Sequence, residues 1–333
     1  MKIFAIFIIL SSFAAAAALV VQGTNNENKI IDNTLNADIQ SSEISIEPGI
    51  STSWDDIQNI QNKALNIVPS QLQTKEIPIG YEISKNKLEQ IKNKPFTSSG
   101  NIFPTNERDT NASTDSTISI STTPKLLSSF EGLSNIDQTS SSIFIPPDPD
   151  IAVGPNHVGT TVNLEFAFYT KSGILVKKTN FPLWFRNIFT PCQTCFLTDP
   201  KIVFTPEGRW IMLVLAGDSA KKQSWYLVSV SKTSDPTGGW FNYKINGALI
   251  FNGLQTWADY PDVGFDRIPS SNGAIYFTSN QLDWTNFNFQ TSLISIIPKS
   301  ILYSGGTPSS TNIKRFFGLK NFDGSQAFTL RAS

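Results

Sequence analysis

The sequence contains very little histidine and cysteine. His157 is the one histidine among 333 residues, and Cys192 and Cys195 are the only cysteines. A single imidazole excludes metal centres built from several histidines, and two cysteines cannot supply the four ligands of a structural zinc site. A Ser-His-Asp triad would depend on this one histidine, and no G-x-S-x-G turn accompanies it. The sequence therefore predicts neither a metal centre of these kinds nor a catalytic triad.

Charge is also scarce. Charged residues make up 16% of the chain, and the formal net charge is −1. This balance argues against a nucleic-acid partner and against binding to a membrane through a basic surface. The sequence contains no glycine-rich phosphate loop and no dinucleotide fingerprint, so no nucleotide cofactor is expected. We expect no cofactor except Ca²⁺, which a carboxylate site could hold.

The first 125 residues differ from the rest of the chain. Residues 1–23 are mostly apolar after Met1-Lys2 and predict a secretory signal peptide, with an uncleaved membrane anchor as the alternative. Residues 24–125 are rich in Asn, Ser, Thr and Gln, and predict a largely disordered, low-complexity pro-segment or stalk. Weak helical patterns cover 55–67 and 83–91, and Asn111 begins an N-x-S glycosylation signal. A secreted or cell-surface location follows.

The two cysteines form a CQTC sequence with loop-like residues on both sides. In a reducing compartment this spacing would suggest a thioredoxin-like redox centre. In an exported chain, a structural disulfide between Cys192 and Cys195 is the better interpretation.

Residues 126–333 predict one β-domain. Its clearest part, 199–245, contains four strand-like runs at 201–204, 209–216, 225–231 and 240–245, separated by turn-forming Pro, Gly and Asp. Four short strands with tight turns are typical of a propeller blade.

The pattern occurs in three approximate copies. Prolines at 149, 200 and 261, spaced by 51 and 61 residues, each open a copy. The sequence therefore predicts an all-β fold, a β-propeller of four-stranded antiparallel blades. Residues 327–333 look like the opening of another strand, so we expect at least three blades and a propeller that is incomplete at its C-terminal end.

Two stretches resemble known proteins. The motifs PPDPDIAVGPNHV, DPKIVF, VSVSKTSDPTGGWFNYKI and DYPDVGFD, within 130–333, resemble a family of exported bacterial and archaeal β-propeller-like proteins without a settled activity. Residues 233–240 are similar to the Asp-box of sialidase-type propellers, with the glycine one position late. The likeness implies a structural turn in which the Asp235 carboxylate accepts backbone N–H groups and Trp240 packs between blades.

Acidic residues stand where each copy opens. In a propeller the inner strands surround a central channel, so residues at their starts would meet at its mouth. We expect a carboxylate set of Asp150, Asp199 and Asp262 for catalysis, as acid and base of glycoside cleavage. Further ligand contacts are expected from a second set: Asp148, Asp259, His157, Tyr260 and Trp257. The alternative is that each aspartate only caps a turn.

The predicted function is that of an exported binding or scaffold propeller. Its ligand would be an extracellular carbohydrate or protein at the channel mouth, and a membrane would be contacted only through an uncleaved anchor. A secreted glycoside hydrolase using the carboxylates is the alternative, and the sequence leaves open whether the protein is an enzyme.

Overall fold

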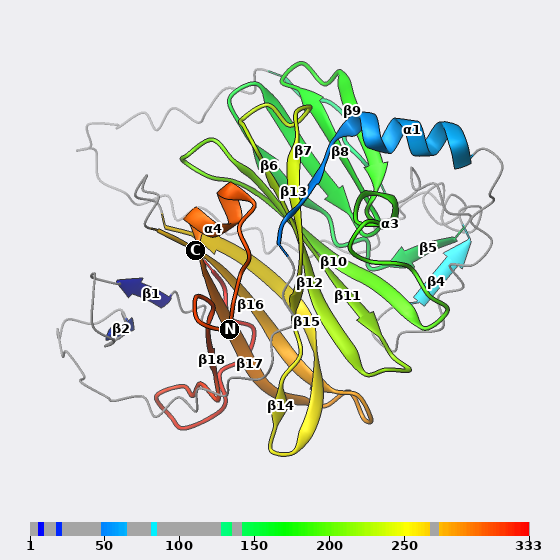
Figure 1. The fold of residues 1–333 in the computed structure, drawn as a ribbon. Helices are drawn as coiled ribbons and strands as arrows, with labels where there is room; N and C mark the ends of the chain where they lie inside the picture. The colour runs from blue at the N-terminus through cyan, green and yellow to red at the C-terminus, as the bar shows by residue number, and fades with distance from the viewer. Residues whose placement is uncertain are drawn as a thin grey trace, which may run out of the picture.

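The computed structural model describes residues 6–9, 18–21, 48–64, 81–84, 128–134, 142–266 and 273–332. These residues form mainly antiparallel β-sheets, with a few short helices at the periphery (Figure 1). Three larger sheets follow one another along the chain, and two two-stranded sheets accompany them.

The first sheet is a four-stranded meander in the order β6-β7-β8-β9. Its strands are β6 (Asp150–Val153), β7 (His157–Val162), β8 (Glu165–Thr170) and β9 (Leu175–Asn180). The second sheet has the order β10-β11-β12-β13-β3. Its strands are β10 (Cys195–Phe204), β11 (Trp210–Asp218), β12 (Gln223–Ser231), β13 (Trp240–Asn246) and β3 (Ile50–Thr52).

The third sheet has the order β14-β15-β16-β17-β18. Its strands are β14 (Ile250–Phe251), β15 (Leu254–Phe265), β16 (Ala274–Asp283), β17 (Phe289–Pro298) and β18 (Lys314–Phe317). The two small sheets pair β1 (Ile6–Ile9) with β2 (Ala18–Val21), and β4 (Tyr81–Ser84) with β5 (Ser142–Ile145).

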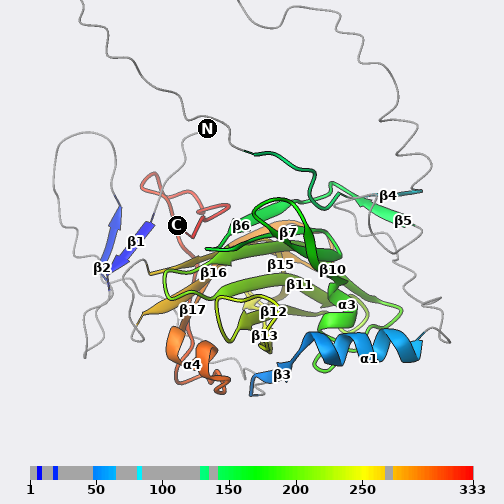
Figure 2. The same cartoon turned by 90° about the horizontal axis from the view of Figure 1, so that it is seen from above.

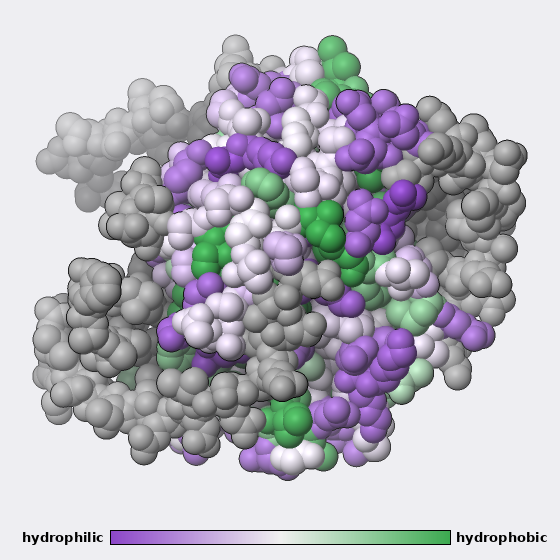
Figure 3. Space-filling view, viewed as in Figure 1, coloured by the Kyte–Doolittle hydropathy of each residue, from purple (hydrophilic) through white to green (hydrophobic). Residues whose placement is uncertain are grey.

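The three large sheets stack face to face, as strand β11 shows. All nine of its residues are buried, because its alternate side chains enter two different cores. Trp210 and Met212 face the first sheet, whereas Ile211 and Leu213 face the third. The second sheet is therefore the middle layer (Figure 2). On the face in Figure 3, hydrophobic residues form only small patches between hydrophilic ones.

The inner strands of the sheets are neighbours. Strand β10 contacts β6 and β7, and β15 contacts β10, β11 and β12. The approach is close at Gly159, where an added Cβ would lie 2.6 Å from Ile202 Cδ1. Consecutive antiparallel meanders stacked with adjacent inner strands are the blade arrangement of a β-propeller, so the predicted fold class is confirmed.

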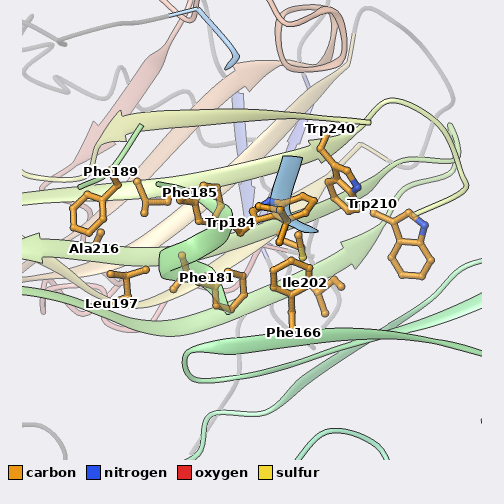
Figure 4. Close-up of a cluster of buried hydrophobic side chains, with 14 of the residues drawn as sticks. Phe166, Phe181, Trp184, Phe185, Phe189, Leu197, Ile202, Trp210, Ala216 and Trp240 are labelled. Atoms are coloured by element: carbon orange, nitrogen blue, oxygen red, sulfur yellow. The ribbon is translucent and has the colours of Figure 1, made fainter. Parts of the chain in front are cut away.

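A dense aromatic core fills the space between the first and second sheets. Helix α3 (Phe181–Trp184) begins at Asn180, whose side chain accepts a hydrogen bond from Leu183 N, and it buries Phe181 and Trp184 in this core. The ring of Trp184 lies 5.8 Å from that of Trp240, and the core continues to Phe189 (Figure 4). Residues 181–194, which connect β9 to β10, therefore contribute side chains to this core.

Residues 48–64, which the sequence placed in the stalk, lie against the second sheet. β3 extends that sheet beside β13, and helix α1 (Trp54–Ala64) follows after a reciprocal cap between Ser53 and Asp56. Trp54 is 4% exposed, and its indole N–H donates to Pro236 O at 2.8 Å. The composition of residues 24–125 did not predict this contact, because most of it comes from one buried tryptophan and one three-residue strand.

Several predicted features fall partly or wholly outside the described residues. They include most of the predicted signal peptide and stalk, Asn111, and most of the weak helical pattern at 83–91, of which Ile83 and Ser84 belong to strand β4. Residues 128–134 are described and form no strand. Among the described residues, no helix has the length and apolar character needed to cross a membrane.

Candidate functional site

Three carboxylates come together just before β6 and beside the bulges of β10 and β15. Asp148 precedes β6, Asp199 lies in β10 and Asp259 lies in β15. The side chains of Asp148 and Asp199 share a hydrogen bond, and the charges of both act on Asp259. Asp199 Oδ2 also accepts the backbone N–H of Tyr260 at 3.1 Å, which joins the bulged part of β15 to the bulged part of β10.

Burial and mutual repulsion perturb two of these carboxyls. Burial, with the charge of Asp199 second, raises the pKa of Asp148 to about 6. The same two causes in the same order raise the pKa of Asp259 to about 7. Each carboxyl therefore holds its proton over part of the range between pH 4 and pH 7, and can donate a hydrogen bond there as well as accept one.

The backbone that carries the site is strained. Asp148, Asp199 and Tyr260 have φ values of 46°, 52° and 49°, and each precedes a proline. Left-handed backbone is unfavourable for residues with a side chain, and a following proline favours extended backbone instead. In β10 and β15 a bulge accompanies this residue, between Thr198 and Lys201 and between Asp259 and Asp262. Strain of this kind collects at functional sites.

Two members of the predicted catalytic set hold backbone instead of meeting at the site. Asp150 Oδ2 accepts Ile202 N at 2.8 Å, which joins the first sheet to the second. Asp262 accepts its own sheet's Val263 N at 3.0 Å and Ala332 N at 3.3 Å. Both aspartates hold backbone, as Asp199 does through Tyr260 N, and they reach other segments of the chain, whereas the alternative expected from the sequence was a cap on a turn.

The carboxylates that meet are therefore Asp148, Asp199 and Asp259. The sequence named all three but grouped them differently, because Asp148 and Asp199 directly precede a proline whereas Asp259 stands one residue earlier, before Tyr260. An aspartate one or two positions before each of Pro149, Pro200 and Pro261 is the signal that would have grouped them.

Of the other predicted ligand contacts, one lies beside the carboxylates with an exposed side chain. The Tyr260 side chain is 45% exposed and follows Asp259 directly in the chain. Trp257 is 1% exposed and packs against Phe196 and Trp284, so it has no free face for a ligand. Its position on β15 directs the indole into an aromatic cluster that the sequence gave no means of locating.

His157 lies at the other end of the first sheet. It begins β7 and pairs with Thr170, whereas the residue opposite Asp150 is Thr161, near the end of the same strand. The carboxylate within electrostatic reach of His157 is Asp235. The imidazole is therefore remote from the three aspartates.

The turn at 233–240 is a structural element. Asp235 Oδ1 accepts the backbone N–H of Thr237 at 2.9 Å and its hydroxyl at 2.8 Å, and these bonds hold the pKa of Asp235 below its usual value. Trp240 is fully buried between the first two sheets and donates to Pro236 O at 3.0 Å.

Cys192 and Cys195 form the expected disulfide. Together with Asp218 they are the one group of three Cys, His, Asp or Glu side chains, among those the structure describes, whose ligand atoms all lie within 4.8 Å of one another. The disulfide removes both thiolates, and Asp218 is engaged by Thr194 Oγ1 at 2.7 Å. This group does not fit a metal ion in its present form.

Comparison with known proteins adds little. No protein-family model and no curated protein matches the chain. Among solved structures, a GH43 endo-arabinanase from Bacillus licheniformis is similar over 54% of this chain and 96% of its own, with 10% sequence identity and a TM-score of 0.27. A similarity at this level carries no argument about function.

Proposed function

We propose that the protein is an exported β-propeller module that binds an extracellular carbohydrate at the site of Asp148, Asp199 and Asp259. The observation that carries this proposal is that three carboxyls of adjacent inner strands, one just before β6 and two beside the bulges of β10 and β15, lie within electrostatic reach of one another. Sugar hydroxyls both donate and accept hydrogen bonds, and carboxyls that change protonation near neutral pH can do both in return. The exposed ring of Tyr260 beside them offers an apolar face for a sugar ring.

Export is part of the proposal. The disulfide is compatible with an oxidising compartment, since such bonds are rare in the cytosol. Mass spectrometry of protein recovered from the producing cells tests this part. Loss of about the first 23 residues from protein outside the cell supports export by a cleaved signal, whereas a full-length cytosolic protein contradicts it.

A glycan array tests the binding function. The wild-type chain should be retained on a subset of oligosaccharides, and Asp199→Asn should lose that retention because it removes the carboxylate between the other two. Asp235→Asn, which alters a remote turn, should bind like the wild type. No retention of the wild-type chain on any glycan, with retention on immobilised extracellular protein, would shift the ligand to the protein class.

Glycoside hydrolysis is the second candidate, and the protonation of Asp259 favours it. A carboxyl with a pKa of about 7 can protonate the leaving oxygen of a glycosidic bond at neutral pH. A water molecule would attack the anomeric carbon and pass its proton to a second carboxylate. Release of 4-nitrophenol from chromogenic glycosides, abolished in Asp259→Asn while array retention persists, would establish this reaction; retention without release on any glycoside leaves binding alone.

Ca²⁺ is the one cofactor that the sequence left open, and the three carboxylates would have to draw closer together to hold it, because they are not among the described groups whose ligand atoms all lie within 4.8 Å of one another. Oxygen donors suit this ion, and a bound cation would lower the pKa of Asp148 and Asp259. Calorimetric titration with CaCl₂ at pH 8 tests it. Heat of binding that disappears in Asp199→Asn supports the site, and the absence of heat in the wild type excludes it.

A further inference from the structure

The segment that follows β18 lies across the third sheet. Thr329 N donates to Asn280 Oδ1 at 2.9 Å, Thr278 Oγ1 donates to Leu330 O at 2.8 Å, and Ala332 N donates to Asp262 Oδ2 at 3.3 Å. The segment thus contacts β15 and β16 of the third sheet, as β10 contacts β6 and β7 of the first.

Two details match this segment to the openings of the three blades. Thr329 has a φ of 55°, close to the 46°, 52° and 49° of Asp148, Asp199 and Tyr260. Threonine is β-branched and is rarely found in this conformation, so the positive φ of Thr329 reflects its place in the fold and not its residue type.

The second detail is a hydrogen bond at the same offset. Ile202 is the third residue after Asp199, and its N–H donates to Asp150 of the preceding blade. Ala332 is the third residue after Thr329, and its N–H donates to Asp262, which occupies the position of Asp150 in the third blade. Residues 329–332 therefore stand where the inner strand of a fourth blade would begin.

This equivalence brings Arg331 to the site. Arg331 corresponds to Lys201, and the charges of both act on Asp262. The Arg331 Nη2 donates to the Tyr260 hydroxyl at 2.7 Å, the guanidinium lies 5.0 Å from the centre of the Tyr260 ring, and Nη1 is 3.7 Å from Asp262 Oδ2. Three separate contacts thus fix one guanidinium against the exposed tyrosine.

We infer that residues 329–332 form a fourth opening of the site and that Arg331 is its positioning residue, which holds the ring of Tyr260 in place beside Asp259 for a sugar to stack on. The inference rests on the proposed carbohydrate-binding function. Arginine suits the role because its planar guanidinium can stack on a ring and donate in a fixed direction at the same time, whereas an ammonium cannot.

Loss of the contacts between Arg331 and Tyr260 should weaken carbohydrate binding without abolishing it. A free tyrosine must be ordered when the ligand binds, and ordering one side chain costs a few-fold in affinity, about three- to tenfold. Arg331→Lys retains a cation near the ring and should give a smaller loss than Arg331→Gln.

The experiment compares full-length Arg331→Gln and Arg331→Lys with Lys320→Gln, which removes the same charge from an exposed residue outside the site. Nitration of Tyr260 by tetranitromethane, followed by peptide mass spectrometry, reports on the phenol without any ligand. The buried Tyr226 is the internal reference. Retention on arrays of neutral hexasaccharides of glucose, galactose, xylose and arabinose reports on binding.

We expect at least threefold faster nitration of Tyr260 and three- to tenfold weaker retention in Arg331→Gln, with Lys320→Gln matching the wild type. Unchanged nitration together with unchanged retention would overturn the positioning role. If the wild-type chain is retained on no saccharide while nitration still responds to Arg331→Gln, the proposed carbohydrate function fails and the contact with Tyr260 stands.

Thr329 provides a separate test of the fourth opening. Thr329→Ala and Thr329→Gly both lose the hydroxyl that accepts from Asn280, but only glycine relieves the positive φ. The glycine variant should therefore melt at a higher temperature than the alanine variant. The reverse order would show that residue 329 does not adopt the backbone conformation of Asp148, Asp199 and Tyr260.

Discussion

Asp259→Asn should stabilise the protein at pH 8, and by less than half as much at pH 5. The carboxyl has a pKa of about 7 in the folded chain and an ordinary value of 3.8 when exposed. The folded state therefore holds the proton more tightly, and the free energy of unfolding falls as the pH rises from about 4 to about 7. Asparagine resembles the protonated carboxyl in shape but cannot ionise, so it removes this penalty.

The magnitude follows from the pKa difference. About three pKa units at about 1.4 kcal/mol each would give roughly 4 kcal/mol if the group were isolated and dry. Asp259 is only partly buried and shares the repulsion with two neighbours, so screening and redistribution of protons reduce the gain to about 1–2 kcal/mol.

Urea denaturation of the wild type and of Asp259→Asn at pH 5 and pH 8 measures the gain. Asp235→Asn is the control with the opposite sign, because hydrogen bonds from Thr237 hold the pKa of Asp235 below its usual value and ionisation stabilises that turn. Asp235→Asn should therefore be less stable than the wild type at pH 8. A gain for Asp259→Asn that is absent at pH 8, or equal at both pH values, would refute the reasoning.

Three further predictions concern stability. Replacing Cys192 and Cys195 by serine opens a very short loop and should cost about 2 kcal/mol, seen as a lower melting temperature that dithiothreitol reproduces in the wild type. Trp54→Ala should cost about 3–5 kcal/mol and expose residues 48–64 to limited proteolysis, because the indole anchors this segment in the core. Lys299→Ala should cost about 3–5 kcal/mol in urea denaturation, since the fully buried ammonium pairs with Glu207 at 2.7 Å; the matched double replacement Lys299→Met with Glu207→Leu should cost less. Equal losses in the single and double variants would contradict the pairing argument.

The blades were predictable because their strands follow local rules. Alternation of apolar residues and turn residues such as Gly208 located strands β10 to β13 to within a few residues, except that β10 begins several residues earlier than expected. Strand β10 continues across the bulge at Asp199, which no periodicity reveals. Helix α1 overlaps the weak helical pattern predicted over 55–67. Its packing against the sheets depends on one long-range contact, the hydrogen bond from Trp54 to Pro236.

The sequence predicted where the candidate site lies, but not which residues form it. The acidic openings indicated where carboxylates would meet, and the inner strands do bring Asp148, Asp199 and Asp259 together. The sequence could not separate them from Asp150 and Asp262, because the long-range partners of these two, Ile202 N and Ala332 N, are brought to them only by the packing of one sheet against the next. Arg331 was missed since its contact with Tyr260 spans 71 residues.

The most direct test of the shared site is a carboxyl NMR titration of Asp259, with ¹³C-labelled aspartate, in the wild type and in Asp199→Asn. If the inner strands bring these carboxylates together, the midpoint should lie near pH 7 in the wild type and fall when the neighbouring charge is removed. A midpoint near pH 4 in both proteins would show that Asp259 is an ordinary exposed aspartate, and would contradict the account of the site.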